Sequence, residues 1–191
     1  MIKEKTLIVF ALVGAALLVG AAYLPRGDNQ AAVSEGLRIG KKARGPNQKP
    51  ALGAPGSEHS HAVLVLFIED TVFDFAQPRY MLRDERAHFE NGDGLTLHKH
   101  STGVTLPYFL KTLGIRIDPA CLTLDTGARY CSDGQKKIRL IVNGEEVVDP
   151  DFYEVQDNDR ILLNYGADSD VRLRLKLNNL PPVVSPFRKP F

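Results

Sequence analysis

The feature that most constrains this chain is a stretch of nineteen uncharged residues near its start, Thr6–Leu24. At about 1.5 Å of rise per residue, a helix of this length reaches roughly 28 Å, close to the thickness of a bilayer's hydrocarbon layer. A helix also satisfies its backbone hydrogen bonds internally, as lipid requires. Lys3 and Lys5 precede the stretch, and Tyr23 stands where an interfacial aromatic residue is expected. The sequence therefore predicts a transmembrane helix over residues 6–24 that contacts lipid or pigment.

Two other interpretations of this stretch stay open. The small residues Gly20-Ala21-Ala22 resemble the cleavage site of a signal peptide, and a buried core helix is the third alternative. The apolar run is longer than a usual signal core, which favours a retained anchor. Basic residues follow between 26 and 44, but long domains cross membranes largely regardless of charge. We expect a single-pass protein of the cell (inner) membrane, with residues 1–5 cytoplasmic and residues 25–191 periplasmic.

Charge is unevenly distributed over the 191 residues, although the formal net charge is only +1. Residues 1–60 carry 8 basic and 4 acidic side chains, whereas residues 61–180 carry 14 basic and 19 acidic ones. Different segments are therefore expected to face different surroundings. A near-neutral chain also argues against nucleic acid as a partner.

Two segments lack the pattern of a folded core. Residues 25–60 contain four Pro and six Gly, which predicts a basic linker. Residues 181–191 form a Pro-rich tail that loses little entropy when it binds. In this tail we predict partner contacts at Pro181, Pro182, Phe187 and Phe191.

Residues 61–180 between them predict one α+β domain. A strand begins at residue 62, Asn91-Gly92 marks a turn, and one short helix begins at Leu106 after a Thr105 cap. Asn143-Gly144 predicts a hairpin. The alternation of apolar and basic residues over 171–177 predicts a final strand with an outer basic stripe, Arg172, Arg174 and Lys176. The stripe is either a solvated edge or a docking surface for an acidic partner or lipid head groups.

Cys121 and Cys131 flank a hairpin whose loop is Asp125-Thr126-Gly127. With Gly127 left-handed, the two cysteines lie opposite one another, as a disulfide requires. Reduced thiols or metal ligands are the alternatives. A disulfide would imply an oxidising compartment.

Two resemblances support this organisation. A strand hairpin, one helix and further short strands follow the order of a β-grasp (ubiquitin-like) domain, and residues 142–166 resemble the end of the small sulfur-carrier proteins of thiamin and molybdopterin synthesis. Those proteins finish in Gly-Gly, whereas this chain continues past Tyr165-Gly166, so the resemblance implies a fold and no sulfur transfer.

The chain is also similar, over residues 59–166, to a poorly characterised group of single-pass exported proteins. The similarity is carried by a combined pattern that includes His-x-His at 59–61, His-Phe-Glu at 88–90, His-x-His at 98–100, Gly-Val-Thr-Leu at 103–106, the cysteine pair, Val-Asn-Gly at 142–144 and Asp-Arg-Ile-Leu at 159–162. Pro107 and Asn158 depart from it. The resemblance implies the anchor and the fold, and it supplies no catalytic residues.

All five histidines fall between positions 59 and 100. His59 with His61, and His98 with His100, are spaced so that each pair points to one side of a strand and can chelate Cu²⁺ or Zn²⁺. His88, with Glu90, could complete a site. The alternative is that each pair lies at a polar strand end or bonds the backbone.

No motif indicates catalysis. The sequence has neither the Gly-x-Ser-x-Gly of a nucleophile elbow nor the Cys-x-x-Cys-His of c-type haem attachment. We therefore expect a non-catalytic accessory subunit of a larger membrane complex, with a photosynthetic reaction centre or a respiratory electron-transfer assembly as candidates. The alternative function is a membrane-anchored periplasmic copper- or zinc-binding protein, and no other cofactor is expected.

Overall fold

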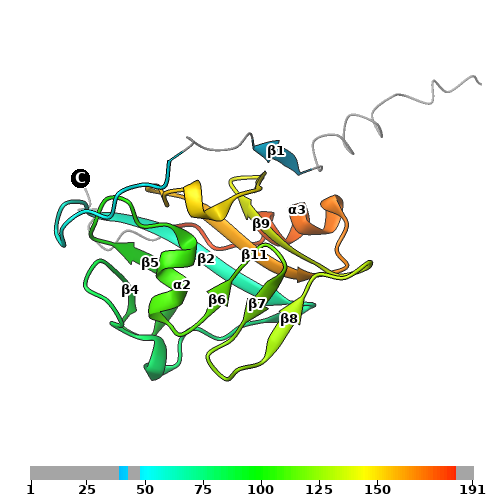
Figure 1. Cartoon of the computed structure of the whole chain (residues 1–191), viewed down its shortest axis with the longest axis horizontal. Helices are drawn as coiled ribbons and strands as arrows, with labels where there is room; N and C mark the ends of the chain where they lie inside the picture. Colours follow the sequence, from blue (N-terminus) through cyan, green and yellow to red (C-terminus); the bar gives the residue numbers. More distant parts are fainter. Residues whose placement is uncertain (1–38, 43–47, 184–191) are drawn as a thin grey trace, which may run out of the picture.

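The computed structural model describes residues 39–42 and 48–183 (Figure 1). The predicted anchor over 6–24, most of the predicted linker, and Phe187 and Phe191 of the tail lie outside these residues. No helix within the described ranges has the length and apolar character needed to span a bilayer.

A large mixed sheet occupies the centre of the described part, and its eight strands are ordered β1-β10-β9-β11-β2-β5-β4, with β3 paired to β2. The strands are β1 (Gly40–Lys42), β2 (Ser60–Ile68), β3 (Thr71–Val72), β4 (Ala87–Glu90), β5 (Asp93–Lys99), β9 (Lys137–Val142), β10 (Glu145–Val147) and β11 (Arg160–Gly166). β2 pairs in parallel with β11 and antiparallel with β5, while β11 pairs antiparallel with β9.

The two faces of this sheet are covered by different elements (Figure 1). On one face lie α2 (Leu106–Thr112) and a three-stranded sheet of β6 (Arg116–Ile117), β7 (Cys121–Thr123) and β8 (Arg129–Cys131), and on the other lies α3 (Asp170–Asn178). Short 3₁₀ turns occur at η1 (Pro78–Tyr80) and η2 (Pro150–Phe152).

Strand β2 is buried on both faces because it lies between these layers. Leu64 and Leu66 belong to the larger core with Phe109 of α2, whereas Val63 and Val65 pack with Leu173 and Leu177 of α3. Burial on both faces explains why the apolar residues of this strand follow one another without the alternating polar positions of a half-exposed strand.

Local turn chemistry fixes several element boundaries as predicted. Thr105 caps α2 by accepting from the Tyr108 backbone N–H, and Gly114 follows the helix at φ +79°. Asn143 and Gly144 both have positive φ between β9 and β10, as a tight hairpin needs.

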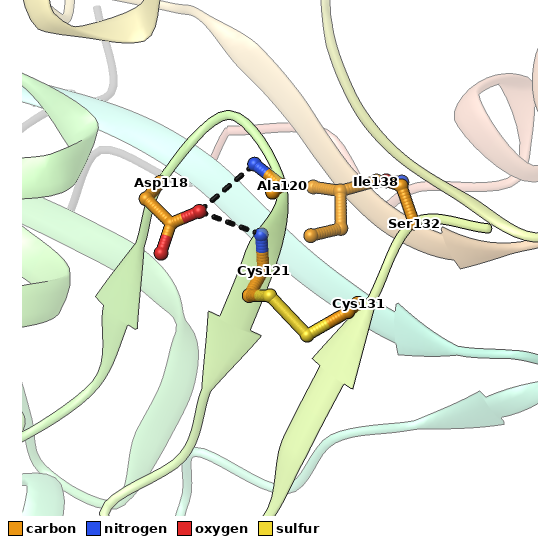
Figure 2. Close-up of a disulfide and its surroundings, with 6 residues drawn as sticks. All are labelled: Asp118, Ala120, Cys121, Cys131, Ser132 and Ile138. Atoms are coloured by element: carbon orange, nitrogen blue, oxygen red, sulfur yellow. Dashed lines mark hydrogen bonds between the residues drawn. A yellow bond between two sulfur atoms is a disulfide. The ribbon is translucent and has the colours of Figure 1, made fainter.

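The disulfide prediction is confirmed. Cys121 and Cys131 are directly paired across β7 and β8, their Cα atoms are 4.0 Å apart, and their sulfurs are bonded (Figure 2). Gly127 adopts φ +86° in the loop between them. The Asp118 carboxylate accepts from the backbone N–H groups of Ala120 and Cys121, which fixes the entry to β7.

The predicted final strand over 171–177 is wrong, because these residues form α3. The four apolar residues of this segment are spaced two apart, as in a strand, but they also form two i, i+4 pairs, as in a helix: Val171 with Leu175, and Leu173 with Leu177. Leu173 and Leu177 use one pair to pack on the sheet, while Val171 and Leu175 are exposed. Ser169 caps the helix by accepting from the Arg172 N–H, and Leu, Arg and Lys favour a helix.

The structure also attaches described parts of the predicted linker to the domain. β1 pairs in parallel with β10. Residues 48–60 are held by hydrogen bonds from Gly53 N to Thr102 O at 3.0 Å and from Gly56 N to His100 O at 2.7 Å. Gly and Pro at these positions shape an ordered connection, so the domain begins before residue 61.

Candidate metal centre

Three histidines lie in a row across strands β2, β5 and β4, which are neighbours in the sheet (Figure 1). His61 is paired in register with His98, and His98 is paired with His88 on its other side. Directly opposite residues of antiparallel strands point to the same face of a sheet. The strand register therefore gathers three imidazoles on one face from positions up to 37 residues apart.

His59 and His100 extend this row into a closed group. The ring of His59 has its centroid 4.8 Å from that of His61 and 4.9 Å from that of His100. The His61 and His98 centroids are 4.7 Å apart, and those of His88 and His100 are 5.0 Å apart. His88 and His98 stack at 6.0 Å. We call these five side chains the histidine cluster.

Burial differs among the five side chains of the histidine cluster. His59 is exposed, and His88 and His100 are half-buried. His61 and His98 retain 4% and 6% exposure. The cluster is thus open to solvent at His59 and most enclosed at His61 and His98.

The Glu90 carboxylate lies beside the cluster. Glu90 follows His88 by two residues on β4, and its two oxygens lie 3.6 Å from His88 Nε2 and 3.6 Å from His98 Nε2. His88 Nδ1 lies 2.9 Å from the carbonyl oxygen of Asp84. A carbonyl oxygen can only accept, so Nδ1 carries the proton and Nε2 of neutral His88 has a free lone pair.

The environment keeps several of these rings neutral. Burial is the largest cause that lowers the pKa of His61, His98 and His100, and neighbouring imidazoles lower it further, while Glu90, and at His61 first Asp157, acts in the opposite direction. His61 Nε2 is buried without a hydrogen-bond partner. Neutral imidazole is the form that coordinates a transition metal.

The side chains as they stand do not form a finished coordination sphere. Among the described residues, no group of three or more His, Cys, Asp or Glu side chains is placed to hold a metal ion. The stacked and edge-on rings must rotate about their side-chain torsions before their nitrogens converge. The cluster supplies the donors, and an ion would have to draw them together.

All five candidate histidines are therefore brought together, which sequence spacing alone could not show. The position of Glu90 beside the cluster was predictable from the sequence, because Glu90 follows His88 by two residues on the same strand. The hydrogen bond between His88 Nδ1 and the Asp84 carbonyl was not predictable, because every residue has a backbone carbonyl and its type therefore gives no indication of such a bond.

The predicted docking residues have mostly intramolecular contacts. Arg172 pairs with Asp70 and Asp168, and Lys176 bonds Asp168 at 2.9 Å. Arg174 donates to the Gly144 carbonyl. Pro181 lines an apolar groove beside α3, and Pro182 lines a second hollow next to Asn158. The basic side chains thus anchor α3 to the loops around it.

Comparison of the chain with family models, curated proteins and solved structures finds no match.

Proposed function

We propose that this domain binds Cu²⁺ or Zn²⁺ through the histidine cluster. The observation that carries the proposal is the closed group of five imidazole rings, three from adjacent strands (His61, His98 and His88) and two from the residues that flank β2 and β5 (His59 and His100). Imidazole suits both ions, and Glu90 adds a carboxylate that divalent cations accept. A solvated strand end would leave its histidines exposed, whereas His61 and His98 are buried.

The test is metal stoichiometry on the full-length chain, produced with its disulfide formed and dialysed against a chelator. We expect about one Zn²⁺ or Cu²⁺ per chain by equilibrium dialysis, and a rise in melting temperature, because an ion that binds the folded state stabilises it by mass action. A His98→Ala/His100→Ala variant should lose both effects. Wild-type protein that stays metal-free, with an unchanged melting temperature, would overturn the proposal.

We propose a binding role and no catalytic one. The two cysteines of the chain are joined, so neither supplies a thiolate nucleophile. The imidazoles of the cluster and the Glu90 carboxylate beside them are a set that a metal carrier or sensor also uses. Turnover of any substrate by the metal-loaded protein would contradict this assignment.

We also propose that the domain lies outside the cytoplasm, held to the inner membrane by the segment over 6–24. The Cys121–Cys131 disulfide supports this placement, since such bonds persist in oxidising compartments. Protease added to spheroplasts should degrade the domain, and a cytoplasmic marker should survive. Protection of the domain until the membrane is opened would contradict the placement.

The fold that we propose is of the β-grasp type. Its support is the central order β5-β2-β11-β9, in which the first and last of these strands along the chain pair in parallel, together with α2 packed on one face. An experimental structure with another order of these four strands would refute it.

A role as an accessory subunit of a membrane complex is the second candidate. The observation that favours it is an apolar groove lined by Phe67, Val72, Leu95 and Leu175, next to Pro181 where the Pro-rich tail begins. A neighbouring subunit could cover this surface and the anchor together. Co-purification from mild detergent tests it, and migration of the chain alone near its own mass would exclude it.

A further inference from the structure

We infer that the ion is held at one end of the histidine cluster, by Nε2 of His88, Nε2 of His98 and the carboxylate of Glu90, with Nε2 of His61 as the fourth ligand. His59 and His100 are then not ligands. This inference rests on the proposed metal-binding function and adds to it a ligand set and an ion class.

The first support is the spacing of donors around Glu90. Each carboxylate oxygen is 3.6 Å from one imidazole nitrogen, His88 Nε2 or His98 Nε2. Ligands at about 2.1 Å from one tetrahedral ion lie about 3.4 Å from one another. Each N···O separation is within a few tenths of an ångström of this spacing. The two nitrogens face different oxygens, so in a tetrahedral site one oxygen binds the ion and the second imidazole turns toward it.

The second support is the orientation of His88. Its Nδ1–H donates to the Asp84 carbonyl at 2.9 Å. Metal-ligating histidines almost always donate their second ring nitrogen to such a group, which fixes the tautomer and the ring direction. His88 Nε2 is in this way presented to Glu90 before any ion arrives.

The third support is the unpaired nitrogen of His61. Its side chain is buried, and its Nε2 has no hydrogen-bond partner. A buried polar atom without a partner is rare and costly. His61 lies directly opposite His98, with the ring centroids 4.7 Å apart, so rotation of its ring can bring this nitrogen to the same ion.

The proposed ligand set contains three nitrogens and one carboxylate, which is a donor set for Zn²⁺ or Cu²⁺ and a poor one for Cu⁺, which prefers soft sulfur ligands. The Glu90 side chain is 32% exposed, whereas the side chain of His98 is 7% exposed. An ion therefore has access from the Glu90 side and is enclosed on the His98 side.

Co²⁺ is the probe, because tetrahedral Co²⁺ replaces Zn²⁺ and absorbs visible light. Full-length protein should give the absorption of a four-coordinate Co²⁺ that Zn²⁺ displaces. Loss of a residue that only supports a metal ligand weakens metal binding roughly 10- to 100-fold. Loss of a ligand itself should cost at least as much, so we expect this decrease in Co²⁺ affinity for each of His88→Ala, His98→Ala and Glu90→Gln. His59→Ala and His100→Ala should change the Co²⁺ affinity by less than about threefold, well below the cost of losing a ligand or its support.

Glu85→Gln is the matched control for Glu90→Gln, since Glu85 is exposed on the same segment and pairs with Arg86. Circular dichroism and melting of each metal-free variant show that it is folded. Undiminished Co²⁺ affinity in Glu90→Gln, together with loss in His59→Ala or His100→Ala, overturns this ligand set while metal binding stands. Failure of the wild-type chain to bind Co²⁺, Zn²⁺ or Cu²⁺ overturns both proposals.

Discussion

The ammonium group of Lys99 lies 2.9 Å from the Glu154 carboxylate, and the Lys99 side chain is only 1% exposed. A second carboxylate, that of Glu58, lies 2.6 Å from the same nitrogen. Glu154 also accepts from the Gly103 backbone N–H at 2.6 Å. This buried charge group joins β5 to the segment that precedes β2 and to the residues after η2, and two of its members, Glu58 and Lys99, adjoin His59 and His100 in the chain.

Replacing Lys99 by Met should destabilise the protein strongly. The change leaves two half-buried carboxylates without their cation, and breaking a buried pair from one side costs about 3 kcal/mol or more. Lys136→Met is the matched control, since Lys136 pairs with Glu69 in an exposed position, where water screens the pair and its contribution to stability is small. Urea unfolding of both variants measures the difference. Equal losses would show that the Lys99 group is not buried in solution.

Removing the disulfide should lower stability by a comparable amount. In the chain-entropy model, a bond that closes a loop of about eleven residues contributes about 2.8 kcal/mol. We expect Cys121→Ala/Cys131→Ala to unfold at a lower urea concentration than the oxidised wild type. Reducing agent should shift the wild type and leave the variant unchanged. A wild type insensitive to reduction would contradict the assigned role of the bond.

Gly103→Ala should loosen the segment before β2. Gly103 has φ +76°, and a Cβ atom there would stand 2.1 Å from the Ala51 carbonyl oxygen. The backbone must shift, and strain of this kind costs roughly 1–3 kcal/mol. At Gly134 a Cβ meets nothing within 4 Å, so Gly134→Ala is the control. Hydrogen exchange at Gly53 and Gly56 reports the attachment, and unchanged protection in Gly103→Ala would contradict the close approach.

Alkaline pH should destabilise the domain through Tyr80. Burial, followed by the hydrogen bond to Asp125, raises the pKa of Tyr80 from 10 to about 12. Between these two values the unfolded chain loses the proton that the folded chain keeps, so stability falls as pH rises from about 10 to about 12.

Tyr80→Phe removes this contribution and should flatten the decline, although it also removes the bond to Asp125. Unfolding curves at several pH values compare the two slopes. Identical slopes in the variant and the wild type would mean that Tyr80 ionises normally in the folded protein.

The limits of sequence-based prediction are clearest at α3. The spacing of apolar residues over 171–177 fits a strand and also fits two helical pairs, so the spacing alone does not choose between them. The choice depends on tertiary contacts, because the guanidinium of Arg160 on β11 donates to the carbonyls of Leu177 and Leu180 at the helix end. These partners satisfy groups that a helix terminus leaves unpaired.

The sequence by itself determined the features that depend on neighbours along the chain. The caps at Thr105, the turn at Asn143-Gly144 and the cysteine hairpin follow from local dihedral preferences and short-range hydrogen bonds. Only the tertiary structure decided the helix over 170–178, the attachment of residues 48–60, and the meeting of the five histidines. Each of these depends on contacts between segments distant in sequence, where strand register and burial decide which side chains face one another.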